Sequence, residues 1–302
     1  MGEPAGIGPE IAVAAYKSLG GQIGDHPLKL IGDPDVFRAC GLDADAPVIA
    51  TKAKAERWPG RPDPKNAAAV IEAIETAVSL ARTGGAVVTA PINKAVLVQA
   101  GFGYPGHTEF LEALTKARRA VMMLASDQLR VVPLTIHIPV AEVPRAITTE
   151  AIVETGEIIL TALKRDFAVA APRLAVAGLN PHAGEDGVLG KEDGAIIAPA
   201  VAALKAKGHD VRGPLSADTL FHAEARARYD AVLCMYHDQA LIPIKTLSFW
   251  DGVNVTLGLP IVRTSPDHGT AFDIAGTGKA DARSMIAAIR MAARMADART
   301  NT

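Results

Sequence analysis

A chain of 302 residues is longer than one hydrophobic core usually supports, which predicts two lobes. Hydrophobic residues make up 49% of the chain and aromatic residues only 4%, so the interior is expected to be aliphatic, as in α/β proteins with buried parallel strands. The formal net charge is -2 and the basic residues are scattered, which argues against nucleic acid or a membrane surface as the partner.

Apolar runs alternate with helical patterns along the chain, beginning with a glycine-rich turn, "GEPAGIGPEI", that leads into a helix. The expected strands, in chain order, are 28–32, 86–90, 120–125, 129–137, 173–180 and 230–236. The expected helices are 66–85, 148–167, 194–208 and 282–298. This alternation predicts mixed or parallel sheets with helices on their faces.

Cysteine usage and apolar run lengths bear on the compartment. Cys40 and Cys234 are far apart and in no metal-type spacing, which fits a reducing environment. No apolar stretch approaches the roughly 18 to 20 residues that cross a bilayer, and no signal peptide is recognisable. We therefore expect a cytoplasmic protein without a membrane partner.

Three histidines share one context, because His137, His182 and His237 each follow an apolar strand. The carboxyl ends of strands in open α/β sheets form the edge where ligands bind. Neutral imidazole is the commonest metal ligand, and three protein nitrogens with an open position are typical of a catalytic metal site. In the alternative interpretation, each histidine separately forms a hydrogen bond at the end of its strand.

Two further segments could bind an anion. His107 and Thr108 in "GHTEFL" stand just before a helical pattern, where free backbone N–H groups attract negative charge. Thr108 could equally be a simple helix cap. Downstream, a phosphate or carboxylate could be held by Lys245, Asn254 and Arg263, although scattered basic residues are usually solvated.

The segment "SPDHGTAFDIAGTGKAD" (265–281) is polar, punctuated by glycine and followed by a helical pattern. Such a loop suits the wrapping of a nucleotide, and the alternative is an ordinary surface connection. The opening turn is neither a GxGxxG fingerprint nor a phosphate loop, because its spacing differs from both.

Together, the opening turn and this loop resemble the isocitrate and isopropylmalate dehydrogenase superfamily. Within that superfamily, the chain resembles the 4-hydroxythreonine-4-phosphate dehydrogenases of vitamin B6 synthesis, the PdxA family. The matching segments run in order from residue 2 to about 285: "MGEPAGIGPE", "GHTEFL", "LNPHAGE", "GPLSADTLF", "MYHDQALIPIK" and "GVNVTLGLPIVRTSPDHGTA".

The resemblance implies an α/β, two-lobed isocitrate/isopropylmalate dehydrogenase-like fold, with mixed sheets flanked by helices and a cleft between the lobes. It implies a nucleotide-side lobe formed by 1–103 and 255–302, and a metal and dimerisation lobe formed by 104–254. The family has a short strand before its first glycine turn, whereas this chain begins at that turn.

The resemblance also implies a site. A divalent metal (Zn, Mg or Co) would be held by His137, His182 and His237, which need not come from one chain, because the family is a homodimer with a shared active site. Substrate contacts would come from His107, Thr108, Lys245, Asn254 and Arg263. NAD or NADP would be bound by Asp267, His268, Gly269 and Asp273.

The implied reaction is NAD(P)-dependent oxidation of the C3 hydroxyl of 4-phosphooxy-L-threonine, a small phosphorylated hydroxy amino acid. The product is a β-keto acid that decarboxylates to 3-amino-2-oxopropyl phosphate. The proton acceptor stays open among Asp218, Asp238 and His107, and Asp238 could instead orient a histidine ring. Alternatives are a related dehydrogenase acting on threonate 4-phosphate or a carboxylated dihydrodiol, a metal-dependent hydrolase or lyase of a phosphorylated metabolite, and a non-catalytic metabolite-binding protein.

Overall fold

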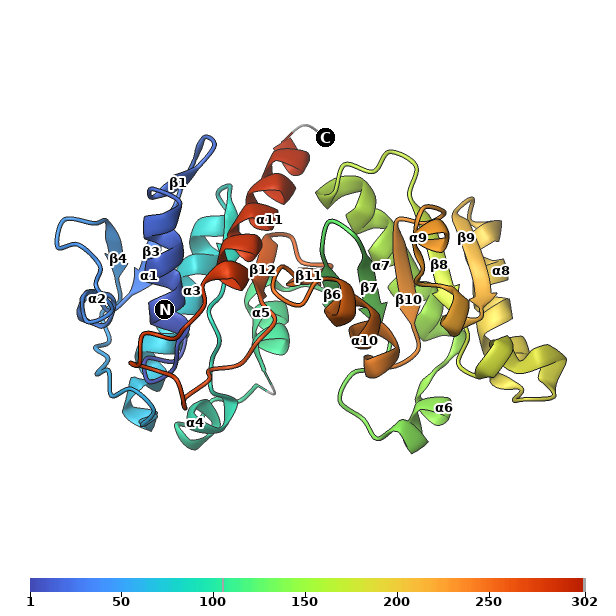
Figure 1. Cartoon of the computed structure of the whole chain (residues 1–302), viewed down its shortest axis with the longest axis horizontal. Helices are drawn as coiled ribbons and strands as arrows, with labels where there is room; N and C mark the ends of the chain where they lie inside the picture. Colours follow the sequence, from blue (N-terminus) through green and yellow to red (C-terminus); the bar gives the residue numbers. More distant parts are fainter. Residues whose placement is uncertain (105, 301–302) are drawn as a thin grey trace. The chain divides into compact units, whose positions relative to one another are not determined.

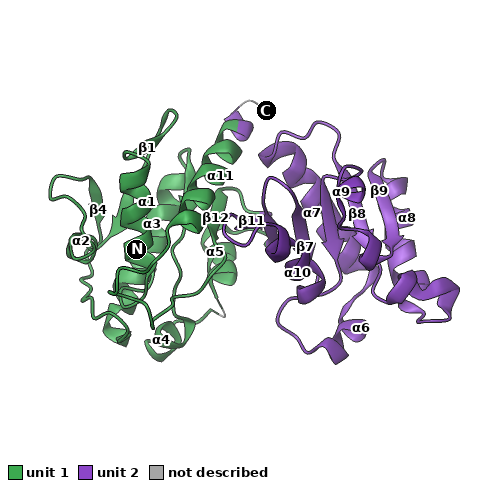
Figure 2. Ribbon diagram, in the orientation of Figure 1, with its two compact units in different colours: residues 1–120, 259–297 green, residues 121–258, 298–302 purple. Residues whose placement is uncertain are grey.

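A computed structural model of the chain describes residues 1–104 and 106–300. The chain divides into two compact units, shown in different colours in Figure 2: unit 1 is 1–120 with 259–297, and unit 2 is 121–258 with 298–302. The boundaries fall later than expected, at 120/121 and 258/259, so the segment that begins at His107 belongs to unit 1. The expected roles of the two lobes stay predictions.

Unit 1 is built from short strands and longer helices, which Figure 1 labels along the chain. Its elements are α1 (Gly8–Ser18), β1 (Gln22–Ile23), β2 (His26–Pro27), β3 (Leu30–Gly32), α2 (Pro34–Arg38), β4 (Val48–Ala50), η1 (Pro64–Asn66), α3 (Ala67–Ala81), β5 (Ala86–Val88), α4 (Lys94–Gln99), α5 (His107–Thr115), β12 (Val262–Pro266) and α11 (Arg283–Thr300).

The strands of unit 1 pair in short ladders: β1 with β2 is antiparallel, whereas the two pairs that follow are parallel. β3 pairs with β4, and β12 pairs with β5, with Val262 opposite Ala86. α3 buries the face that its 3.6-residue pattern predicts, because Val70, Ile74 and Val78 all belong to one hydrophobic cluster. These contacts fix the strand ends from which the loops of unit 1 extend.

Residues 1–3 lie between β3 and β5. The N-terminal amine of Met1 donates to the carbonyl of Ile31 at 2.9 Å, and the Glu3 N–H donates to the carbonyl of Pro91 at 2.9 Å. Beside them is a cavity of about 510 Å³, lined mainly by aliphatic side chains of α1, α3 and α11 and by residues of β3 and β5. Size alone would make this cavity the first candidate for a ligand site. Among the described residues that line it, however, only His107 belongs to the site expected from the sequence.

Unit 2 contains a larger sheet and the helices that pack on it. Its elements are β6 (Val121–Ala125), β7 (Arg130–Pro133), η2 (Val140–Glu142), α6 (Val143–Ala146), α7 (Thr149–Asp166), β8 (Arg173–Ala177), η3 (Pro181–Gly187), η4 (Asp193–Ile197), α8 (Ala198–Ala206), β9 (Asp210–Leu215), η5 (Ala217–Thr219), α9 (Ala223–Arg226), β10 (Ala231–Cys234), α10 (His237–Leu247) and β11 (Val253–Leu257).

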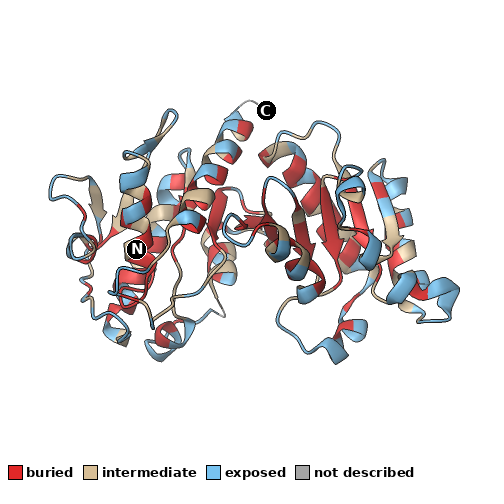
Figure 3. Cartoon of the chain, in the orientation of Figure 1, coloured by how far each residue is buried: buried red, intermediate tan, exposed pale blue. Residues whose placement is uncertain are grey.

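The sheet of unit 2 is mixed, as expected. Its strand order is β11-β6-β7-β10-β8-β9, in which β11, β6 and β7 pair antiparallel and β7, β10, β8 and β9 pair parallel. Figure 3 shows the central strands coloured as buried. Strands buried on both faces are continuously apolar, which is why "AVLC" at β10 was recognisable as a strand.

Some elements differ from the sequence prediction. β7 ends at Pro133 rather than at residue 137, although the Leu134 and Thr135 N–H groups still donate to the carbonyls of Cys234, the last residue of β10, and Met235. β9, β11 and β12 were not anticipated, and neither was α10, whose interior contains Pro243. The expected strand 230–236 is confirmed as β10, which ends at Cys234, and α10 continues through Pro243 although proline usually interrupts a helix. No helix within the described part of the chain has the length and apolar character needed to cross a bilayer.

Candidate active site

The three histidines of unit 2 follow strands that are direct neighbours in the sheet. His137 lies four residues after β7, His182 lies in η3 after β8, and His237 begins α10 after β10. Because β7, β10 and β8 are parallel and adjacent, their carboxyl ends meet at one edge of the sheet. The structure therefore confirms that the histidines follow strands, with β7 shorter than expected.

His137 and His237 lie close together. Their ring centroids are 5.8 Å apart and the rings are inclined by 41°. The His237 side chain is 35% exposed, and its Nδ1 contacts the Asp238 carboxylate at 2.7 Å. A carboxylate on one ring nitrogen fixes the orientation of the ring and directs the other nitrogen toward a ligand.

His182 lies in a segment with an unusual backbone, because residues 182–186 all have positive φ. Backbone of this kind is strained and persists only where its surroundings hold it. The buried Asp193 holds the preceding residues, accepting hydrogen bonds from the N–H groups of Leu179 at 2.8 Å and Asn180 at 3.1 Å. Asp193 packs so closely that a Cβ on Gly178 would come within 2.7 Å of its Oδ1. The sequence offered no signal for this role of Asp193.

The buried Gln239 links the loops after β10 and β8. Its Oε1 accepts from the N–H of Met235, and its Nε2 donates to the carbonyl of Gly178, both at 2.7 Å. Gln239 lies in the segment "MYHDQALIPIK", but no role was predicted for it from the sequence. Even so, no three His, Cys, Asp or Glu side chains are placed to hold a metal within the described residues of one chain. The chain thus pairs His137 with His237 and does not add His182.

Asp218 lies in η5 and is exposed. Its carboxylate accepts a hydrogen bond from the Ser216 hydroxyl at 2.6 Å. This hydrogen bond, and to a smaller extent the nearby His182, lowers the pKa of the Asp218 carboxyl. Asp218 is therefore ionised at neutral pH and can accept a proton.

Lys245 and Asn254 also belong to unit 2. Lys245 lies in the last turns of α10, with its Nζ 6.0 Å from the centre of the Phe249 ring. Asn254 lies in β11, opposite Leu124 of β6. Both residues are half-buried.

In unit 1, His107 and Thr108 are the first two residues of α5, and Gly106 is the N-cap. The interpretation of Thr108 as the helix cap is therefore wrong, because the extended backbone of Gly106 begins the helix without a side-chain cap. Both side chains instead lie in the first turn, where the N–H groups lack helical acceptors.

Arg263 lies in β12 and is 4% exposed. Its Nη2 donates to the Thr89 hydroxyl at 2.6 Å, a contact that the sequence pattern did not reveal. Burial lowers the pKa of the Arg263 guanidinium to about 10, so the group keeps its charge at neutral pH. A buried cation of this kind is well suited to an anionic ligand.

His107 is affected by the same environment. Burial, and then the positive charge of Arg263, holds the pKa of His107 well below its usual range. Its Nε2 is buried and has no hydrogen-bond partner among the described residues. His107 is thus a neutral imidazole with a nitrogen able to bond a ligand.

The cofactor candidates lie between β12 and α11, in the same unit. The Nδ1 of His268 is 3.0 Å from the carbonyl of Gly269, and the carbonyl of Thr270 accepts from the N–H of Ile7 at 2.9 Å. Asp267 is half-buried, and Asp273 is exposed. The structure therefore brings the glycine-punctuated segment against the opening turn, the two stretches that carried the superfamily resemblance.

Comparisons with known proteins agree on one family. The family described as "Pyridoxal phosphate biosynthetic protein PdxA" matches residues 23–292. A protein of Methylorubrum populi named 4-hydroxythreonine-4-phosphate dehydrogenase is 52% identical, over 100% of this chain and 94% of its own length.

Solved structures give the same result and confirm the expected α/β fold. The 4-hydroxythreonine-4-phosphate dehydrogenase of Klebsiella pneumoniae superposes with a TM-score of 0.87 at 39% identity, covering 98% of this chain and 96% of that one. A terephthalate 1,2-cis-dihydrodiol dehydrogenase from Burkholderia xenovorans has a TM-score of 0.67 at 29% identity, with 97% and 96% covered.

Proposed function

Because this chain belongs to the PdxA family of pyridoxal phosphate biosynthetic proteins, we propose that it oxidises 4-phosphooxy-L-threonine at its C3 hydroxyl with NAD or NADP. The β-keto acid formed then loses carbon dioxide to give 3-amino-2-oxopropyl phosphate. The observation that carries the proposal is the pair of rings of His137 and His237 at the carboxyl edge of a sheet, in a chain whose full-length relatives are named dehydrogenases.

The paired rings fit a divalent metal, which we propose is zinc, magnesium or cobalt. Imidazole nitrogens favour zinc or cobalt over magnesium, which prefers oxygen ligands, and Asp238 already orients the ring of His237. When bound, the metal supplies Lewis acidity that lowers the pKa of a substrate hydroxyl and stabilises negative charge on its oxygen.

The phosphate group of the substrate needs cationic and hydrogen-bonding partners. In unit 1 we assign Arg263 as a charged contact, with His107 and Thr108 supplying hydrogen bonds at the first turn of α5. In unit 2 we assign Lys245 and Asn254 to substrate binding. Binding energy from a remote phosphate group can be used to orient the reacting carbon.

The two aspartates of unit 2 are proposed to have different roles. Asp218 is exposed and ionised, so we assign it as the acceptor of the hydroxyl proton. Asp238 is already bonded to the ring of His237, so we assign it to orient that ring.

The dinucleotide is proposed to bind unit 1 through Asp267, His268, Gly269 and Asp273. This segment is polar, and its His268 Nε2 is buried without a hydrogen-bond partner among the described residues. When bound, the nicotinamide would supply the hydride acceptor, and these residues would position it. A cytoplasmic location stays a prediction from cysteine usage.

We further propose that the enzyme is a homodimer in which a second copy supplies the missing metal ligand. One chain pairs His137 with His237 but leaves His182 apart from them. A partner contributing His182 would complete a three-histidine set with an open position, as catalytic metal sites require.

Mixing of variants tests this shared site. His137→Ala and His182→Ala should each be inactive alone, whereas coexpressed chains should regain about a quarter of wild-type activity, because half the dimers are mixed and each has one intact site. If all three ligands came from a single chain, each site in the mixed dimer would lack one ligand and activity would not return.

A turnover assay tests the reaction itself. Purified protein with divalent metal, NAD or NADP and 4-phosphooxy-L-threonine should form reduced nicotinamide, detected by its absorbance, together with carbon dioxide. Metal-loaded, folded protein that forms neither product from this substrate would contradict the assignment.

Other substrates belong in the same assay. A carboxylated dihydrodiol is the second candidate, because the dehydrogenase of Burkholderia xenovorans shares the fold at 29% identity. The buried Arg263 beside His107 favours a phosphorylated substrate, so threonate 4-phosphate should rank above the dihydrodiol. A metal-dependent hydrolase or lyase is the other alternative. Such an enzyme needs no nicotinamide, so the polar segment 265–281 would have no function in it.

A further inference from the structure

Three loops of unit 1, the first of which runs into the start of α1, are joined by backbone contacts, and we call them the clasp: residues 2–10, 57–60 and 270–276. The Ile7 N–H donates to the carbonyl of Thr270 at 2.9 Å, and the Gly60 N–H donates to the carbonyl of Ala5 at 2.8 Å. The first and third loops are also joined through a side chain, because the Glu10 Oε1 accepts from the N–H of Gly276 at 2.8 Å.

Arg57 forms the centre of the clasp. Its side chain is 6% exposed, and its Nη1 donates to the carbonyls of Pro4 and Gly6, the latter at 2.9 Å. Its Nη2 forms an ion pair with the Oε1 of Glu10, the same oxygen that accepts from Gly276. The planar fork of an arginine can bond these three acceptors at once, which a lysine ammonium in the same place cannot do with the same geometry.

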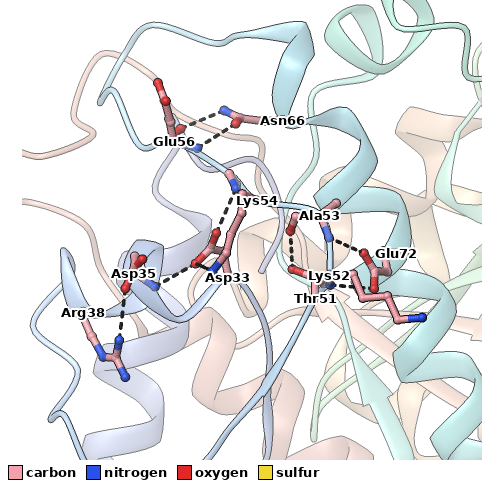
Figure 4. A network of polar contacts seen from close by, with 11 residues as sticks. Asp33, Asp35, Arg38, Thr51, Lys52, Ala53, Lys54, Glu56, Asn66 and Glu72 are labelled. Carbon is pink, nitrogen blue, oxygen red and sulfur yellow. Dashed lines mark hydrogen bonds and ion pairs between the residues drawn. The ribbon is translucent and has the colours of Figure 1, made fainter.

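A set of side chains holds the segment before Arg57, as Figure 4 shows. Glu72 of α3 accepts from the N–H groups of Lys52 at 2.8 Å and Ala53 at 2.9 Å. Asp33 accepts from the N–H of Ala55 at 3.0 Å, and the side chain of Asn66 bonds both the N–H and the carbonyl of Glu56. These hydrogen bonds hold the backbone of residues 52, 53, 55 and 56. The guanidinium of Arg57 therefore extends from a fixed segment of the chain.

The loops of the clasp approach too closely for side chains at two glycines. A Cβ on Gly6 would lie 2.7 Å from the carbonyl oxygen of Thr270, and one on Gly276 would lie 2.8 Å from the Pro59 side chain. Gly276 also has a φ of +76°, which favours glycine. These close contacts therefore restrict how far the three loops can move relative to one another.

We propose that Arg57 is a positioning residue for the nicotinamide dinucleotide. The inference rests on the proposed function, in which residues 267–273 bind the dinucleotide. Arg57 fixes the opening turn and neutralises Glu10, and these in turn hold Thr270, within the binding segment, and Gly276, three residues beyond it. Without Arg57, the half-buried Glu10 carboxylate loses its counter-charge and the binding segment loses its support.

The test compares Arg57→Lys, Glu10→Gln and the matched control Arg61→Lys, whose side chain is exposed and lies four residues further along. Binding of NADH and NADPH is measured by nicotinamide fluorescence, which requires no turnover. Steady-state kinetics then give the KM for the oxidised dinucleotide and kcat, and thermal melting reports the fold.

For Arg57→Lys, the dinucleotide Kd and KM should rise by about tenfold, the size of one charge-assisted hydrogen bond, with kcat at saturation within about twofold of wild type. The affinity for inorganic phosphate should be unchanged. Glu10→Gln should weaken dinucleotide binding by about threefold, since the amide oxygen still accepts from Gly276 but carries no charge. If Arg57→Lys fails to fold, Glu10→Gln decides the question.

Two outcomes would overturn the proposal. One is a lower melting temperature with an unchanged dinucleotide Kd, which would make Arg57 purely structural. The other is an equal loss of dinucleotide affinity in Arg61→Lys, which would show that the effect does not depend on the contacts that Arg57 makes. A wild-type protein that binds neither NADH nor NADPH would instead contradict the proposed function.

Discussion

The two units present their candidate ligand-binding groups in opposite ways. In unit 1 the groups are buried: Arg263 is 4% exposed, and the Nε2 of His107 is inaccessible to solvent. In unit 2 the His237 side chain is 35% exposed, and Asp218 is exposed. Each arrangement is suited to a different kind of ligand.

Burial makes the unit 1 groups selective for an anion. Burial first, and then the charge of Arg263, keeps His107 neutral, so this part of unit 1 presents a cation beside a neutral hydrogen-bonding ring, which suits an anion. The unit 2 edge can gain a metal and a residue from a second chain, because its histidines are accessible. The comparison implies that substitutions in one unit should affect metal binding and those in the other should affect anion binding.

Loss of a metal ligand should have the largest effect. His237→Ala should remove bound metal and lower kcat by more than about a hundredfold, because a metal ligand and its orienting contact with Asp238 are lost together. Metal content is measured by elemental analysis of the purified protein. His222→Ala is the control, since His222 is also exposed and bonded to a carboxylate, that of Glu224. Retained metal in His237→Ala would show that the paired rings are not the site.

The second largest effect on kcat is expected for Asp218→Asn. Removal of a proton acceptor costs about a hundredfold or more in kcat, and the amide cannot ionise at any pH. Metal content should stay the same in the variant, which separates the loss of a proton acceptor from the loss of a metal ligand. A kcat close to wild type would exclude Asp218 as the proton acceptor.

Arg263→Lys tests whether the buried groups of unit 1 bind an anion. The lysine keeps the charge but loses the fork that bonds Thr89, so the Kd for inorganic phosphate should rise by about tenfold to a hundredfold. Phosphate binding is measured by calorimetry with metal-loaded protein. Metal content should not change, and a variant that lost metal instead would contradict the separation of roles between the units.

The smallest expected effect is on how the free energy of unfolding of unit 1 depends on pH. The folded state lowers the pKa of His107, so below about pH 6.5 the unfolded chain binds a proton that the folded chain does not. Its contribution to the free energy of unfolding is therefore present above pH 6.5 and is lost as the pH falls below that value. His107→Gln should show a shallower loss than wild type in urea titrations between pH 7.5 and 5.5. Parallel curves for the two proteins would mean that His107 is not buried in its neutral form.

Much of the fold could be predicted from local patterns. The 3.6-residue period of α3 and the continuous apolar runs of β8 and β10 are properties of short stretches, and burial selects for them directly. The positions of His137, His182 and His237 after strands followed from the same patterns. The sequence pattern did not predict α10, which continues through Pro243 because Ala240, Leu241 and Ile244 pack in the core of unit 2.

The sequence by itself determined the α/β class, the family and the residue types available for chemistry. Only the tertiary structure decided which of them meet: His137 with His237, Arg263 with Thr89, Asp193 with the loop before His182, and Arg57 with Glu10. These pairs are separated by up to 174 residues along the chain, so no local period records them. Contacts of this kind depend on how strands and helices pack, and packing is a property of the folded chain as a whole.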